Sequence, residues 1–174
     1  TVHMIRSHTP PPGTAVYRSM DWGYATPYCV LWAYEDCDGR LIIFRELYGW
    51  GGSADVGSKT PEVEVAREIK EMEADLEVIY GVADNQCWTK IGISNKDKEI
   101  ATIIGNMEQE GVYFDKAIKD PMAGTAEIHN RLRIDADSER PWMYITEDCK
   151  HTWRTVPMLQ SDEKRSGCYQ TKNV

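Results

Sequence analysis

Apolar and polar residues alternate in the early part of the chain, which is the pattern of strands with one buried face. The alternation covers residues 16–20, and residues 28–35 and 41–49 are rich in strand-forming side chains. Residues 36–40, which read DCDGR, separate the last two stretches, and Asp-Gly favours a tight turn. We therefore predict an antiparallel meander of three strands, preceded by an irregular lead-in over residues 1–14.

The spacing of apolar residues becomes that of a helix after residue 59. Thr60 is a candidate N-cap, Pro61 suits the first turn, and the carboxylate of Glu62 suits the positive end of a helix. We expect this helix to end near Asp75. Its apolar face carries residues four and three positions apart, namely Val65, Ile69 and Met72.

Strand and helix patterns alternate in the second half of the chain. Residues 76–85, LEVIYGVADN, are apolar on both faces and end in an acid, which is typical of a central, buried strand. The other expected elements are a helix over 97–110, a strand over 112–117, a helix over 123–135, a strand over 142–147 and a short helix over 148–159. This order predicts a mixed α/β fold of packed layers, within a single domain over residues 1–174.

Charge and cysteine content narrow the possible functions. The 174 residues carry a formal charge of −8, which argues against a generally basic surface for nucleic acid but permits an enzyme that meets phosphate through divalent cations. The five cysteines form no Cys-x-x-Cys pair, so we expect reduced thiols and no structural zinc site. No apolar run has the length of a membrane span, and the first residues lack the apolar segment of a signal peptide.

A glycine-rich loop over residues 49–59 lies between a strand and a helix, where a phosphate-binding loop would be. Gly52 and Gly57 have the spacing of the P-loop motif. However, Ser58 occupies the position of the essential lysine, and Lys59 comes one residue late. We therefore expect an ordinary connecting loop.

Two acids follow apolar strands: Asp21 ends the first, and Asp84 ends the buried one. If these strands are parallel neighbours, both carboxylates lie at one edge of the sheet, where open α/β sheets build their sites. Such a pair repels unless a proton or a cation lies between the carboxylates, and Mg²⁺ or Mn²⁺ prefers oxygen ligands. An aspartate after a strand is also a common turn residue or helix cap, so both interpretations stay open.

Other charged residues are weaker candidates. Glu46 comes near the end of the third strand and could reach the two aspartates, but a solvated position is the simpler expectation because that strand lies one strand further away. Four basic residues could form a strip for a DNA backbone or be scattered over a solvated surface; they are Lys116, Lys119, Arg131 and Arg133.

The order and spacing of four segments carry a family resemblance. The segments are SMDWGYATPYCVLW, DGRLIIFRELYG, VIYGVADNQCW and PWMYITEDCKHTWRTVPMLQSDEK, within residues 17–164. Together they resemble the nuclease domain of the large terminase subunit of tailed bacteriophages. The resemblance implies an RNase H-like fold with a mixed central sheet flanked by helices. It also places Asp21 and Asp84 on the positions of the family's first two metal-binding acids.

The resemblance implies an activity and partners as well. The family is a metal-dependent endonuclease that cuts concatemeric double-stranded viral DNA during genome packaging, and two-metal-ion hydrolysis would use Asp21 as the bridging ligand and Asp84 as the ligand of one ion. The implied partners are double-stranded DNA, the portal of the procapsid and the small terminase subunit. The implied location is the cytoplasm of the host bacterium.

The chain departs from the family pattern near its end. The family continues with a helix that carries a further metal-binding aspartate, whereas residues 165–174, RSGCYQTKNV, contain no acid. Asp162 and Glu163 match the loop before that helix. We therefore expect an impaired site, and two alternatives stay open: an inactive terminase fragment that still docks on DNA or the portal, and another RNase H-like nuclease such as a junction resolvase.

Overall fold

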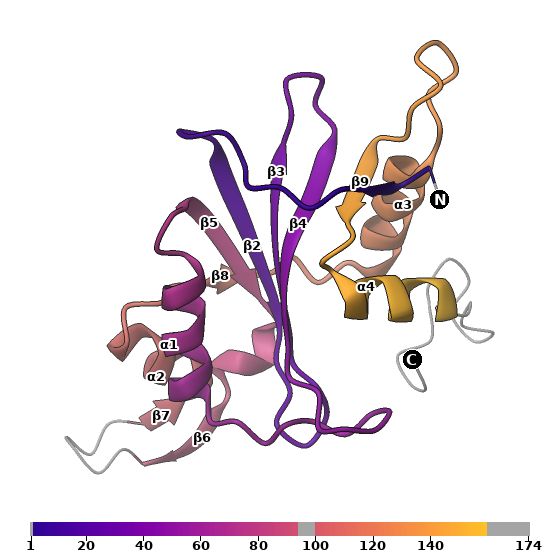
Figure 1. Cartoon of the computed structure of the whole chain (residues 1–174). Helices are drawn as coiled ribbons and strands as arrows, with labels where there is room; N and C mark the ends of the chain where they lie inside the picture. Colours follow the sequence, from indigo (N-terminus) through magenta and orange to yellow (C-terminus); the bar gives the residue numbers. More distant parts are fainter. Residues whose placement is uncertain (1, 94–99, 160–174) are drawn as a thin grey trace. The chain divides into compact units, whose positions relative to one another are not determined.

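A seven-stranded sheet and four α-helices make up most of the computed structural model, which describes residues 2–93 and 100–159 (Figure 1). The strand order in the sheet is β1-β9-β4-β3-β2-β5-β8. The strands are β1 (Met4–Ile5), β2 (Ala15–Asp21), β3 (Cys29–Glu35), β4 (Leu41–Tyr48), β5 (Glu77–Ala83), β8 (Asp115–Lys116) and β9 (Met143–Thr146). The helices are α1 (Glu62–Met72), α2 (Ile103–Gln109), α3 (Pro121–Leu132) and α4 (Lys150–Thr155).

The predicted meander is confirmed, because β2, β3 and β4 are consecutive neighbours in the sheet. The predicted tight turn joins β3 to β4: the Asp36 amide donates to the Arg40 carbonyl, and the Gly39 amide donates to the Asp36 carbonyl. Parallel neighbours need a connection of a dozen residues or more, so these short connections make the three strands antiparallel. By contrast, β9 pairs in parallel with both β1 and β4. The sheet is therefore mixed, as the sequence predicts.

The chain divides into two compact units, each described here by itself. Unit 1 consists of residues 1–15, 31–46 and 120 onward, and unit 2 consists of residues 16–30 and 47–119. In unit 1, the strands β1, β9 and β4 carry a core of Met143, Ile145 and Cys149, against which Leu41, Ile43, Leu132 and Trp153 pack. The helix α3 of this unit has no buried residue.

Unit 2 contains β2, β5 and β8 with the helices α1 and α2, which pack against each other. An ion pair at 2.9 Å between Arg67 and Glu110 also links the two helical segments. The buried apolar residues of this unit include Val16, Met20, Val65, Ile69, Ile104 and Met107. A smaller sheet pairs β6 (Lys90–Ile93) with β7 (Ile100–Thr102) in antiparallel fashion.

Several predicted elements require correction. The lead-in over residues 1–14 contains the strand β1. The helix expected to end near Asp75 ends at Met72, and its N-cap is Pro61 rather than Thr60. The expected helix over 97–110 is a strand followed by the shorter helix α2, and residues 94–99 lie outside the described part. The later elements occur where predicted, with shifted ends.

The strand β5 is less buried than its composition predicts. Gly81 and Ala83 at its end are buried, but Ile79 and Tyr80 are 54% and 47% exposed. The cause is the shortness of β8, which pairs only with Val82 and Ala83. The outer edge of the first half of β5 therefore lacks a strand partner among the described residues.

Among residues 2–93 and 100–159, no helix combines the length and the apolar character that a membrane span requires.

Candidate metal centre at the ends of β2 and β5

Asp21 is the last residue of β2 and is exposed. Along this strand Val16, Arg18 and Met20 are buried, whereas the residues between them are exposed. The alternation therefore places Asp21 on the opposite face from the buried core of unit 2.

The loop that follows Asp21 is held by aromatic stacking and by the glycine-rich loop. The rings of Trp22 and Tyr28 stack with their centroids 5.9 Å apart. The amide of Gly57 donates to the carbonyl of Ala25 at 2.8 Å, and a Cβ on Gly57 would lie only 2.3 Å from the carbonyl oxygen of Thr26. The glycine-rich loop thus packs closely against the loop that carries Asp21.

The same contacts argue against phosphate binding by the glycine-rich loop. A P-loop needs free backbone amides that point at the phosphates. Here the amides of Gly51, Gly57 and Ser58 donate to the carbonyls of Val56, Ala25 and Gly49. The sequence prediction of a connecting loop therefore agrees with the structure.

Asp84 follows β5 directly and uses its two carboxylate oxygens differently. Oδ1 accepts a hydrogen bond of 2.8 Å from the amide of Gln86 and caps the short 3₁₀ helix Asn85–Trp88. Oδ2 lies 4.0 Å from Nζ of Lys119, and both side chains are partly exposed. The helix-cap interpretation is therefore correct for one oxygen, and the other faces a lysine ammonium.

The two aspartates lie within electrostatic reach of each other. Partial burial of its carboxyl raises the pKa of Asp21, and the negative charge of Asp84 raises it further. Because β2 and β5 are neighbours in the sheet and both aspartates stand at strand ends, this proximity means that the two strands run in parallel. The sequence-based pairing of Asp21 with Asp84 at one sheet edge is thus present in the fold.

Cys87 lies in the same electrostatic environment. Burial, followed by the charges of Asp84 and Asp21, raises the pKa of its thiol to about 11. A thiol with this pKa stays protonated at neutral pH and is a poor nucleophile. The chemical character of the site is therefore that of paired carboxylates rather than of a reactive thiolate.

Oxygen donors with a net negative charge fit a hard divalent cation, because a cation relieves the repulsion between the carboxylates. Within the described residues, no three His, Cys, Asp or Glu side chains form a cluster that could hold a metal ion. Asp162, Glu163 and the tail over residues 165–174 lie outside the described part. The described donor set is thus Asp21 and Asp84.

Glu46 has a structural role that corrects the expectation of a solvated side chain. Its carboxylate accepts hydrogen bonds from the amides of His151 and Thr152, at 2.7 and 2.9 Å, and from Oγ1 of Thr152, at 2.8 Å. Cys149, the N-cap of α4, makes no side-chain cap of its own. Glu46 therefore caps α4 from the neighbouring strand of unit 1.

The four residues of the suggested basic strip have different surroundings. In unit 2, Nζ of Lys116 lies 5.5 Å from the centroid of the Trp88 ring, and Lys119 faces Asp84. In unit 1, the guanidinium of Arg131 is held by Glu127, Glu35 and the carbonyl of Gly39. Arg131 is therefore largely committed to internal contacts.

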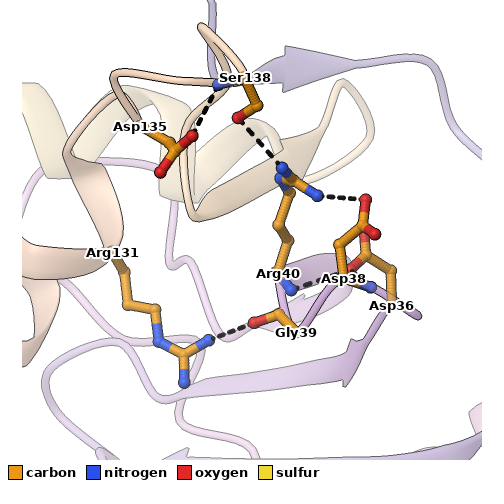
Figure 2. Close-up of polar contacts among 7 residues, drawn as sticks. All are labelled: Asp36, Asp38, Gly39, Arg40, Arg131, Asp135 and Ser138. Atoms are coloured by element: carbon orange, nitrogen blue, oxygen red, sulfur yellow. Dashed lines mark hydrogen bonds and ion pairs between the residues drawn. The ribbon is translucent and has the colours of Figure 1, made fainter.

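A second polar cluster surrounds the β3–β4 turn in unit 1 (Figure 2). Arg40 pairs with Asp38, donates to Oγ of Ser138 at 3.3 Å and lies over the Trp142 ring. Asp135 accepts hydrogen bonds from the amides of Ser138 and Asp137, which lowers its pKa. Because carboxylates and backbone groups occupy the guanidinium groups, this cluster joins the turn to the 133–141 loop and does not add to the metal centre.

Comparisons with known proteins bear on this fold. Neither the family models nor the curated proteins include a match to this chain. Solved structures match over almost all of it. The large terminase of a thermophilic bacteriophage, at 18% identity and a TM-score of 0.68, covers 99% of this chain, which spans 39% of that protein. The P22 large terminase nuclease domain, at 11% identity and a TM-score of 0.65, covers 98% of this chain and is itself covered to 80%.

The nuclease of the large terminase from the thermophilic phage G20c is also similar. It has 12% identity and a TM-score of 0.59, and the match covers 97% of this chain and 83% of that one. At these identities the similarity shows the fold, which is that of a terminase nuclease domain. The RNase H-like fold class predicted from the sequence is confirmed.

Proposed function

We propose that this chain is the nuclease domain of a phage or prophage DNA-packaging terminase, which hydrolyses double-stranded DNA with divalent metal ions. The observation that carries the proposal is the pair Asp21 and Asp84 at the carboxyl ends of neighbouring strands. The fold, shared with terminase nuclease domains, supports it. The chain spans only 39% of the similar full-length large terminase, so the proposal concerns a nuclease domain and not a packaging motor.

Asp21 and Asp84 are the residues that would hold Mg²⁺ or Mn²⁺, with Asp21 shared between two ions and Asp84 on one of them. When bound, such ions activate water and stabilise the leaving oxygen of a phosphodiester. The protein supplies the negative oxygen ligands and fixes Asp84 through its cap on the Gln86 amide. We assign no nucleophilic role to Cys87, because its thiol stays protonated.

The proposed partners follow from the same function. They are double-stranded DNA, the portal of the procapsid and the small terminase subunit, in the cytoplasm of the host bacterium. Lys119 provides a cation beside the acid pair, where a phosphate of the substrate would approach.

One observation favours a second candidate function. The described residues place only two carboxylates together, without a third ligand group. Two carboxylates hold a pair of ions less firmly than a larger set, because affinity rises with the number of charged ligands. The second candidate is therefore a domain that keeps the fold and docks on DNA or the portal without cutting.

Plasmid nicking separates the two candidates. The purified chain is incubated with supercoiled plasmid and Mn²⁺, beside Asp21→Asn, Asp84→Asn and the control Asp115→Asn, an exposed aspartate of β8. The nuclease function predicts nicking by the parent and the control, and a fall to the metal-free level in the other two variants. Nicking that persists in both variants would exclude the assigned site. Mn²⁺ binding by calorimetry without nicking supports the docking function.

A further inference from the structure

A buried arginine on β2 contacts three other segments of unit 2. The side chain of Arg18 is only 5% exposed. Its Nη1 donates to the carboxylate of Glu73 at 2.5 Å, and its Nη2 donates to the carbonyl of Tyr113 at 2.7 Å. The guanidinium carbon lies 4.1 Å from the centroid of the Phe114 ring. One side chain thus connects β2 with the end of α1 and with the segment that enters β8.

The guanidinium crosses β5 at a residue without a side chain. A Cβ on Gly81 would lie 3.2 Å from both Nε and Nη2 of Arg18, and 3.4 Å from a ring carbon of Phe114. The pairing of Val82 with Asp115 in the β5–β8 register places Gly81 beside Phe114. Arg18 is therefore enclosed between Phe114 and the backbone of β5, and any larger residue at position 81 would push it away.

This contact lies upstream of the acid pair on both strands. Arg18 precedes Asp21 by three residues, and Gly81 precedes Asp84 by three residues. At a rise of about 3.3 Å per residue, the contact is about 10 Å from the carboxylates along each strand. The position at which Arg18 meets β5 therefore determines how far β5 advances when it reaches Asp84.

The hydrophobic pattern of β5 does not define this register well. Its apolar residues occupy both faces, and Ile79 and Tyr80 are exposed. A strand whose two faces are equally apolar loses little when it slips by one residue, so its register is weakly specified. A guanidinium has a fixed fork geometry, and acceptors on two different segments can be reached in only one arrangement.

We propose that Arg18 is a positioning residue for the carboxylate pair: it fixes the register of β5 against β2 and so places Asp84 beside Asp21. The role of the pair in metal binding rests on the function proposed above, whereas the register itself does not.

The test compares four variants in the whole chain. Arg18→Met keeps the length of the side chain without its donors, and Arg18→Lys keeps the charge without the fork. Gly81→Ala keeps every hydrogen-bonding group and displaces the guanidinium by a few tenths of an ångström. Ile69→Val, in the buried face of α1, is a control that destabilises the same unit without touching the contact.

Two measurements follow for each variant that stays folded in a thermal melt. Cross-strand nuclear Overhauser effects between β2 and β5 report the register without metal, and calorimetry reports the Mn²⁺ dissociation constant. We expect Arg18→Met and Gly81→Ala to change the cross-strand pattern and to weaken Mn²⁺ binding at least tenfold. Arg18→Lys should lie between them and the parent, and Ile69→Val should keep the pattern and stay within twofold in affinity.

The outcomes separate this inference from the proposed function. If the parent binds no Mn²⁺ but the variants change the register, the positioning role stands and the metal function fails. If Arg18→Met does not fold, Gly81→Ala decides. A parent-like cross-strand pattern in the folded variants would overturn the inference, whatever the Mn²⁺ affinity.

Discussion

Asp21 combines partial burial with a neighbouring negative charge, and both raise the pKa of its carboxyl. The raised pKa means that the folded state prefers the neutral form more than the unfolded state does. The resulting stabilisation is fully present below the ordinary pKa of 3.8 and is lost as the pH rises through the higher pKa of the folded state. At neutral pH without metal, Asp21 is therefore a destabilising residue.

We predict that Asp21→Asn raises the melting temperature at pH 7 in the presence of EDTA, because the amide resembles the neutral carboxyl. The gain should shrink as the pH falls and vanish below about pH 3.8, the ordinary value for an aspartate. Melting curves between pH 3 and pH 8 check this. The control Asp115→Asn should stay within about 0.5 kcal/mol of the parent. A gain that is equally large at low pH would contradict the electrostatic explanation.

Lys119 competes with a metal ion for Asp84. The two groups are 4.0 Å apart and partly exposed, and such pairs contribute about 0.2–1 kcal/mol. Lys119→Met should therefore raise Mn²⁺ affinity by about 1.4- to fivefold, because both the ion pair and the repulsion of the dication are lost. Calorimetry at fixed salt measures the change, with Lys90→Met, an exposed lysine of β6, as the control. A lower affinity in Lys119→Met would show that the lysine supports the metal instead.

At the level of single residues, the sequence identifies the acids but not what surrounds them. Asp21 and Asp84 stand out because each follows an apolar strand. Arg18 was not predicted, although the alternation of Val16, Arg18 and Met20 places it on the buried face of β2. Lys119 could not be assigned to Asp84, because the contact depends on where β8 pairs with β5, and two residues of strand leave no pattern to detect.

Among the secondary-structure elements, α4 depends on a residue of another element. It has only six residues and no side-chain N-cap, and the carboxylate of Glu46 accepts two of its amide hydrogens. We predict that Glu46→Ala lowers the free energy of unfolding by about 1–3 kcal/mol, because the amides lose a charged acceptor in a partly buried place. Glu46→Gln, which keeps one acceptor oxygen, should lose less.

Urea unfolding followed by circular dichroism measures this difference. The dependence on urea should keep its slope, because the surface exposed on unfolding is unchanged. Glu77→Ala, an exposed residue of β5, is the control and should stay within about 0.5 kcal/mol. If Glu46→Gln and Glu46→Ala were equally unstable, the contribution would come from charge and not from the acceptor oxygens.

Hydrophobic periodicity predicts elements well where one face is buried and a turn is marked. The β2–β4 meander and α1 satisfy both conditions. The helix expected over 97–110 was wrong at its start because the β-branched residues within Ile100–Ile103 favour a strand, and α2 begins only where Thr102 Oγ1 accepts from the Gly105 amide. Thr60 is not the cap of α1, because its hydroxyl bonds that of Ser58 instead.

The charge of the whole molecule sets the conditions for DNA binding. The formal charge is −8, and in the described part of the chain several cations are already paired with carboxylates, namely Arg18, Arg40, Arg67, Lys119 and Arg131. Affinity for duplex DNA normally comes from free lysines and arginines that displace counterions. This chain offers little of that kind, so its attraction to DNA should depend on cations that it binds.

We predict that the chain does not bind a 30-base-pair duplex in EDTA at about 0.1 M salt, and that Mg²⁺ or Ca²⁺ at millimolar concentration produces binding. The reason is that a bound dication converts the carboxylate pair from a repulsive into an attractive feature for phosphate. Fluorescence anisotropy of labelled DNA measures both conditions, and the double variant Asp21→Asn/Asp84→Asn is the decisive control. Neutralising the two acids lowers the negative charge of the chain, so simple repulsion predicts that the double variant binds better in EDTA. Metal-mediated binding predicts that it loses the response to Mg²⁺. Salt-sensitive binding of the parent in EDTA would contradict the prediction and would show that its free basic residues form a DNA-binding surface.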